Sequence, residues 1–196
     1  MHPEIISLVL FMFATSCTPG PNNIVASYSG FNFGISKTIP HMLGVIFGFT
    51  ILTIITNFGL INIFQKYSII QEILKYAGTL FLIYLAYKIS FSKNNSKHSK
   101  QNPITFMETF FFQFINPKSI IVVVIMISTY VERGENFLNY SFWVVGVAFT
   151  FALISIIFWT LIGKFLRKFA TNDKFIKRFN YVMTFLLISC IATFYL

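Results

Sequence analysis

The feature that most constrains this chain is the length of its uncharged stretches. No Asp, Glu, Lys or Arg occurs within residues 5–36, 38–65, 136–163 or 179–196. A helix needs about 20 mainly apolar residues to cross the ~30 Å hydrocarbon core of a bilayer. The pattern therefore predicts membrane-spanning helices and excludes a soluble domain.

Two further apolar segments complete the set. Residues 69–90 carry Glu72 and Lys75 near their start, and residues 104–131 carry Glu108 and Lys118. Only 11% of the chain is charged and its mean hydropathy is +0.72, whereas about a quarter of the residues in a soluble domain are charged. We predict an all-α integral membrane protein with six transmembrane helices.

The polar stretch 92–102 divides the chain into two halves of similar length. Its sequence, S-K-N-N-S-K-H-S-K-Q-N, is typical of a solvated linker. We therefore predict a first three-helix repeat over residues 1–91, a cytoplasmic linker over 92–102 and a second three-helix repeat over 103–196, all within one membrane domain.

The basic residues indicate the orientation, because Lys and Arg in short loops remain on the cytoplasmic side. With six spans, the odd-numbered loops carry 11 basic residues and the even-numbered loops carry 3. This split predicts that both termini lie outside, and it explains the net charge of +9 without a nucleic-acid partner.

Two proline motifs interrupt spans that would otherwise be regular helices. The first span contains P-G-P-N-N at residues 19–23, and the fourth contains N-P-K at residues 116–118. Each motif lies about 15 residues into its span, near the membrane midplane at 1.5 Å per residue. Broken helices at matching positions of two three-span halves are typical of transporters with inverted repeats.

The chemistry of such breaks suits a zwitterion. Proline frees backbone groups that lipid cannot satisfy, so a break persists only against protein or a polar cavity. Helix N-termini suit a carboxylate, while unwound carbonyls and the amides of Asn22, Asn23 and Asn116 suit an ammonium group. A structural kink is the alternative interpretation, because proline and glycine are common in membrane helices.

Lys118 is the most informative single residue. An ammonium group near the middle of a membrane costs at least ~2.5 kcal/mol, so it indicates a partner, a cavity or a function. It is a candidate to bind a substrate carboxylate, and the alternative is a side chain that extends to the interface from a tilted span.

Other functional classes find little support in the residues. The sequence contains no nucleophile motif, phosphate loop or metal-ligand cluster, so we expect no enzyme, no cofactor and no bound metal. The first apolar run could also be a signal peptide, but no basic residue precedes it. A cation exporter and a non-transporting membrane scaffold remain alternatives; the scaffold would have no use for a polar midplane.

Four segments together resemble the LysE/RhtB family of bacterial amino-acid exporters. They are P-G-P-N-N, the run from Gly30 to Gly48, the run from Leu74 to Ile89, and F-F-F-Q-F-I-N-P-K-S from Phe110 to Ser119. The resemblance covers nearly the whole chain. It implies a bacterial inner-membrane exporter of amino acids or close derivatives, such as homoserine, threonine, leucine or lysine, driven by the proton-motive force.

By position, the resemblance implies a substrate site on both breaks, formed by Pro19, Gly20, Pro21, Asn22, Asn23, Asn116, Pro117 and Lys118. Many family members carry Asp where this chain has Asn22, so a dibasic substrate is less favoured here. Because no membrane-embedded Asp is evident, the candidate proton-coupling groups are Lys118, His41 and Glu108.

Glycine pairs four residues apart, which let membrane helices approach closely, occur at Gly30 and Gly34 and at Gly44 and Gly48. They favour helix packing and are compatible with a homodimer. The expected partners are otherwise an amino-acid substrate and membrane lipid.

Overall fold

The structure is a computed structural model that describes residues 3–90, 103–132 and 134–195. Within these residues it is helical and contains no strand. In chain order the elements are α1 (Ile5–Cys17), α2 (Pro21–Ile55), the π-helical turn η1 (Thr56–Leu60), α3 (Ile61–Lys66), α4 (Ser68–Ser90), α5 (Phe106–Ile115), α6 (Pro117–Tyr130), α7 (Phe137–Arg167) and α8 (Asp173–Ala192). The predicted linker, residues 92–102, lies outside the described residues.

Several of these helices can cross a membrane by length and composition. Four described segments qualify, namely Pro21–Ile63, Ile69–Ser90, Phe137–Arg167 and Asp173–Ala192, and α5 with α6 adds a fifth span if this bent pair is counted as one. Helix α1 is apolar but only 13 residues long. The all-α membrane class is confirmed, while six spans and inverted repeats stay predictions.

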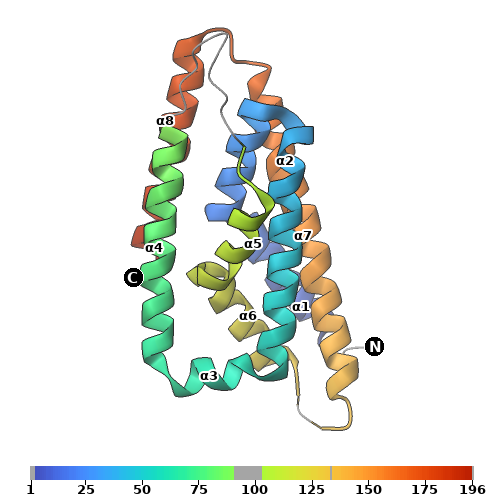
Figure 1. The fold of residues 1–196 in the computed structure, drawn as a ribbon. Helices are drawn as coiled ribbons and strands as arrows, with labels where there is room; N and C mark the ends of the chain where they lie inside the picture. Colours follow the sequence, from blue (N-terminus) through green and yellow to red (C-terminus); the bar gives the residue numbers. More distant parts are fainter. Residues whose placement is uncertain (1–2, 91–102, 133, 196) are drawn as a thin grey trace.

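Helix α2 reverses direction part of the way along (Figure 1). A straight segment of 43 residues would measure about 65 Å, roughly twice the hydrocarbon thickness of a bilayer. The turn falls at Gly34, whose φ of 76° and ψ of 177° are accessible mainly to glycine. Gly34 was predicted to pack against another helix, but a Cβ there would meet nothing within 4 Å, so its role is the turn.

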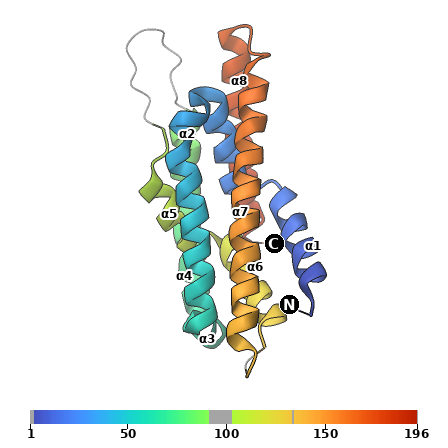
Figure 2. The same ribbon diagram turned by 90° about the vertical axis from the view of Figure 1, so that its right-hand side faces the viewer.

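The connections lie at two ends of the bundle. The turn at Gly34, the end of α4 and the α7–α8 connection lie at one end, and α3 and the α6–α7 connection lie at the other (Figures 1 and 2). The first end also carries Lys88 of α4 and Lys164 and Arg167 of α7 in their last helical turns. The predicted separation of odd from even loops depends on six spans and stays a prediction.

Glycines set the closest helix contacts. A Cβ on Gly30 would lie 2.3 Å from the Thr160 carbonyl oxygen of α7, and one on Gly163 would lie 2.0 Å from the Ser27 carbonyl oxygen of α2. A Cβ on Gly44 or Gly48, in the second part of α2, would lie 2.6 or 2.7 Å from a carbonyl oxygen of α5. The main chains of α2, α5 and α7 therefore pack tightly around the helix breaks.

Candidate functional site: a cavity between two helix breaks

Both proline motifs produce real breaks in the helices. The first is the extended segment between α1 and α2, where Thr18 has φ and ψ of −70° and 128° and Gly20 has −147° and 172°. The second is Asn116, at −83° and 107°, where α5 and α6 meet at a bend of 59°. Pro21 and Pro117 each open the following helix, because the first helical position needs no N–H donor.

Residues from the two breaks line one cavity of about 80 Å³. Six of the eight predicted site residues line it: Gly20, Pro21, Asn22, Asn23, Asn116 and Lys118. Pro19 is exposed and Pro117 is buried, and neither lines this cavity. The remaining lining residues come from α1, α2, α6 and α7: Met12, Thr15, Ser16, Val45, Phe49, Ser119, Val122, Ala152, Ser155 and Ile156.

Side chains from distant segments satisfy the carbonyls freed at the first break. The Ser16 carbonyl oxygen accepts hydrogen bonds from Asn23 Nδ2 at 3.1 Å, Ser155 Oγ at 3.1 Å and Trp159 Nε1 at 3.3 Å. The Thr18 carbonyl oxygen accepts one from Asn23 Nδ2 at 3.2 Å. Helix α7 therefore helps to stabilise the unwound backbone that lipid could not.

Lys118 connects the second break to the first. Its Nζ donates to the Thr18 carbonyl oxygen at 3.0 Å. A Cβ on Gly20 would lie only 2.9 Å from the same Nζ, so the absence of a side chain at Gly20 makes room for the ammonium group. The half-buried Lys118 is thus held at the cavity by a defined contact.

The N-termini of the two helices differ in their capping. Asn116 caps α6, because its Oδ1 accepts a hydrogen bond from the Lys118 backbone N–H at 3.2 Å. Helix α2 follows Gly20 and has no side-chain cap. Uncapped N–H groups and the positive end of the helix dipole attract an anion, and the Lys118 ammonium lies beside them. This corner of the cavity is suited to a carboxylate.

Asn22 is held by a partner that the sequence did not reveal as a site residue. Asn22 Nδ2 donates to Gln113 Oε1 at 2.8 Å, and Gln113 Nε2 donates back to Asn22 Oδ1 at 3.0 Å. Gln113 is fully buried, and its Oε1 also accepts from Ser119 Oγ at 3.0 Å. This amide pair fixes the start of α2 to α5. An uncharged amide within the run F-F-F-Q-F was the available signal for Gln113.

Three hydroxyl groups on the cavity wall offer oxygen lone pairs. Each uses its own proton inside the protein: Thr15 donates to the Phe11 and Met12 carbonyls, Ser119 to Gln113 Oε1, and Ser155 to the Ser16 carbonyl. A hydroxyl that donates in this way still accepts hydrogen bonds. These oxygens can receive the N–H groups of an ammonium ion. Nothing in the sequence singled out Thr15, Ser119 or Ser155.

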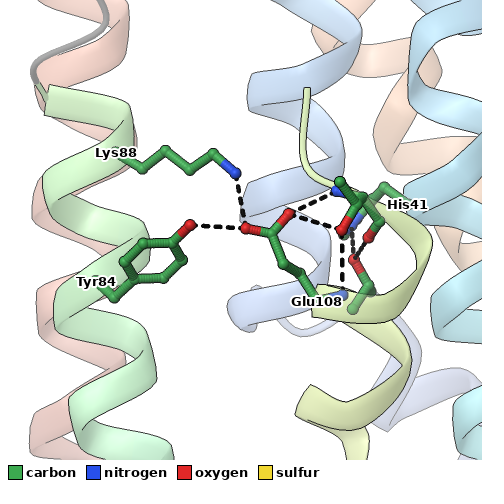
Figure 3. A network of polar contacts seen from close by, with 6 residues as sticks. His41, Tyr84, Lys88 and Glu108 are labelled. Carbon is green, nitrogen blue, oxygen red and sulfur yellow. Dashed lines mark hydrogen bonds and ion pairs between the residues drawn. The ribbon is translucent and has the colours of Figure 1, made fainter. Parts of the chain in front are cut away.

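His41 and Glu108 belong to a polar network beside the cavity (Figure 3). The buried His41 contacts Thr109 Oγ1 through Nδ1 at 2.9 Å and the Asn22 carbonyl oxygen through Nε2 at 3.3 Å. Glu108 forms an ion pair with Lys88 Nζ at 2.8 Å and accepts a hydrogen bond from Tyr84 at 2.7 Å. His41 therefore contacts the first break directly, whereas Glu108 connects α5 to α4.

Glu108 also shapes the start of α5. Its Oε2 accepts from the Thr105 N–H at 2.7 Å, while Thr105 Oγ1 accepts from the Glu108 N–H at 3.3 Å. This reciprocal arrangement is a capping box.

In the part of the chain that the structure describes, no group of three or more His, Cys, Asp or Glu residues could hold a metal ion.

Comparison with known proteins identifies the family of this chain. The model of the LysE type translocator family matches residues 13–195, which include both breaks. The chain belongs to the LysE translocator family. This LysE-family chain is therefore a transporter rather than an enzyme, and a multi-pass bacterial membrane protein.

Its relatives in the LysE family match over almost their whole length. The chain is 29% identical over 194 residues to the cysteine/O-acetylserine efflux protein of Escherichia coli O139:H28, and 28% identical over 194 residues to that of strain K12. The protein of the same name from Salmonella choleraesuis is 28% identical over 195 residues. Each match covers 97% of both chains. No solved structure matches the chain.

Proposed function

We propose that this protein exports small amino acids with uncharged side chains, or close derivatives of them, from the cytoplasm. The observation that carries the proposal is that residues of both helix breaks line a single cavity together with an ammonium group and three side-chain hydroxyl groups. The relatives named as cysteine/O-acetylserine efflux proteins support substrates of this size and charge.

The cavity fits each part of such a substrate. The carboxylate binds the Lys118 ammonium and the uncapped N–H groups of α2. The ammonium binds the hydroxyl oxygens of Thr15, Ser119 and Ser155. Apolar side chains, among them Val45, Phe49, Val122, Ala152 and Ile156, surround the substrate side chain, and an unpaired charge among them would be costly.

Export proceeds in this proposal by alternating access between two inverted repeats of three spans. The reversal of α2 at Gly34 supports a first span made of α1 and the start of α2, and the bent α5–α6 pair supports a matching fourth span. Both halves then carry a proline-opened helix after the break. In the bacterial inner membrane, the basic end of the bundle faces the cytoplasm and both termini lie outside. We also propose that the protein forms a homodimer.

Proton-motive force drives the export in this proposal, and the coupling group is Lys118, His41 or Glu108. His41 and Lys118 both contact backbone carbonyls of the first break. Neutral replacements, Lys118→Met, His41→Gln and Glu108→Gln, distinguish the three. If His41 or Glu108 is the coupling group, its variant keeps substrate exchange across the membrane but loses efflux driven by a pH gradient. Lys118→Met slows exchange as well, because Lys118 also binds the carboxylate. Undiminished pH-driven efflux in all three variants rejects the assignment.

The main test is efflux from cells that are preloaded with labelled amino acids. The panel is cysteine, O-acetylserine, homoserine, threonine, leucine and lysine, and the variants are Lys118→Ala and, as a matched control, Lys164→Ala at the exposed end of α7. Loss of a charged hydrogen bond to the carboxylate should slow efflux by about 10-fold to 100-fold in Lys118→Ala only. Unchanged efflux of the whole panel, with or without the protein, would reject the exporter.

A further inference from the structure

A second polar cavity lies toward the opposite end of the bundle from the basic residues. It measures about 210 Å³, compared with about 80 Å³ for the cavity at the breaks. One water molecule needs only about 10–15 Å³ measured in this way, so the space admits a ligand of several heavy atoms. The lining residues are Asn57, Ile61, Asn62, Ile127, Ser128, Val131 and Phe137.

Asn57 forms the buried base of this second cavity. It is 3% exposed, and its Nδ2 donates to Ser141 Oγ at 2.7 Å. Its Oδ1 is buried and accepts no hydrogen bond from any residue that the structure describes. A buried acceptor of this kind costs about 1–3 kcal/mol if it stays unpaired. Asn57 therefore favours a ligand that brings an N–H or O–H donor.

The backbone around Asn57 is irregular. Asn57 lies in the π-helical turn η1, where Gly59 has a φ of 158°. Single π-helical turns inside α-helices occur frequently at functional sites, because they re-aim a side chain that a regular helix would place elsewhere. Here the turn brings the Asn57 side chain to a cavity that the exposed Asn62 and Ser128 border.

An apolar band separates the two cavities along two different helices. On α6, Ser119 and Val122 line the first cavity and Ile127 and Ser128 line the second, while Val123 and Met126 between them are fully buried. On α2 and its continuation, Leu52 lies between Phe49 at the first cavity and Asn57 at the second. The eight residue-to-residue steps from 49 to 57 rise about 12 Å along the helix.

These buried residues belong to one hydrophobic cluster, which also includes Leu8, Val144 and Ala148. Met12 of the first cavity and Ile61 and Ile127 of the second are members of the same cluster. Packed apolar side chains therefore lie between the two cavities.

We propose that the Asn57 cavity is a second binding site for the exported amino acid, occupied after the substrate passes the apolar band. The Asn57 amide turns so that its buried Oδ1 accepts from the ammonium group, and the carboxylate lies at the exposed border of the cavity. None of the seven described lining residues is charged, which fits a ligand of zero net charge. This inference rests on the proposed export function.

Protection of an introduced thiol tests the second site directly. Ser128→Cys is placed in a background without the native thiols, Cys17→Ala and Cys190→Ala, and is labelled with a membrane-impermeant maleimide. An exported amino acid at four times its Kd for the Asn57 cavity should slow labelling of the thiol by about fivefold, because one such cavity in five remains empty. Thr129→Cys is the matched control, since Thr129 is exposed and does not line the cavity.

Two further variants separate binding at Asn57 from a remote conformational change. Protection should persist with Lys118→Ala, which disables the first cavity, and disappear with Asn57→Leu. If protection is lost with Lys118→Ala and kept with Asn57→Leu, the thiol reports only binding at the breaks and the second site is rejected. Val131→Phe, which fills the cavity from its edge without removing a hydrogen bond, replaces Asn57→Leu if that variant does not fold.

The outcome also distinguishes this inference from the proposed function. Efflux by the intact protein without any protection of the Ser128→Cys thiol would overturn the second site and leave the exporter standing. Absence of both efflux and protection would overturn both proposals.

Discussion

The two helix breaks use the same sequence device and reach different structural states. At each, a short extended segment is followed by a helix that opens with proline. At the second break, Asn116 caps the new helix and Gly78 of α4 lies against the Ile115 carbonyl. At the first break, the helix after Gly20 has no side-chain cap.

This difference indicates that a broken helix is not by itself a binding site. What matters is which of the freed backbone groups the protein satisfies internally. The second break is closed by its own asparagine and by helix packing, so it acts as a rigid support for Lys118. At the first break the Ser16 and Thr18 carbonyls accept hydrogen bonds, but the helix after Gly20 has no side-chain cap, so this break is the part that can bind an anion.

Gly78→Ala should have the largest effect of the substitutions considered, because it disturbs the packing of α4 against the second break. Its Cβ would lie 2.2 Å from the Ile115 carbonyl oxygen and 3.0 Å from Pro117 Cδ, and neither atom can move without shifting the break. We expect the free energy of unfolding to fall by about 3 kcal/mol, the upper range for overpacking, which is roughly a 100-fold change in the unfolding equilibrium. Thermal unfolding in detergent measures it.

Gly146→Ala is the matched control for this substitution, because a Cβ at Gly146 meets nothing within 4 Å. It should leave the unfolding temperature unchanged or slightly raised, as alanine is the better helix former. Equal stability of Gly78→Ala and Gly146→Ala would mean that the second break is not held by packing against α4.

Gly20→Ala should affect transport rather than stability. The new Cβ would lie 2.9 Å from Lys118 Nζ, the end of a flexible side chain that can move aside, and the extended backbone at Gly20 is allowed for alanine. The displaced ammonium no longer meets the substrate carboxylate, so we expect efflux to slow about tenfold at unchanged protein abundance.

A double-mutant cycle shows whether this effect acts through Lys118. In a Lys118→Ala background, Gly20→Ala should slow efflux no further, because residues that act on one interaction are not additive. A full additional tenfold loss in the double variant would mean that Gly20 serves the backbone of the break and not the ammonium group.

The positions of the breaks could be predicted from the sequence because each combines proline with residues that favour an unwound backbone, whereas the single Pro40 lies within helical α2. P-G-P-N-N and N-P-K each removed backbone hydrogen bonds at a place where lipid offers none, and the structure places a break at each. The turn at Gly34 was less accessible, since a glycine four residues from Gly30 equally matches a packing motif.

The partners of the break residues could not be predicted in the same way. Ser16, Ser155 and Trp159 meet only because α1 and α7 pack together, and their sequence separations of about 140 residues carry no local signal. The last helix shows a related limit. An uncharged span was expected from residue 179, but α8 begins at Asp173 because Asn172 caps it at 2.8 Å, and its first two turns are charged.

Asn116→Ala should have a smaller effect than either glycine substitution. It removes the cap of α6, which costs about 1 kcal/mol, or roughly fivefold in the unfolding equilibrium. Asn116→Asp keeps an oxygen that accepts from the Lys118 N–H and should unfold within about 0.5 kcal/mol of the intact protein. If Asn116→Ala is as stable as the intact protein, the second break is not closed by its own asparagine, and the contrast with the first break disappears.

Glu108→Gln should have the smallest effect, because Glu108 connects α5 to α4 and so belongs to the second, rigid break. Glutamine keeps one oxygen for the capping box with Thr105, and its NH2 group replaces the oxygen that accepts from Tyr84 and Lys88. The partly exposed ion pair that is lost contributes less than about 1 kcal/mol. We therefore expect efflux, with or without a pH gradient, to change less than about twofold, within the range of one weak ion pair. Loss of pH-driven efflux would instead place proton coupling on the α4–α5 contact, and the second break would then be part of the transport chemistry and not only its support.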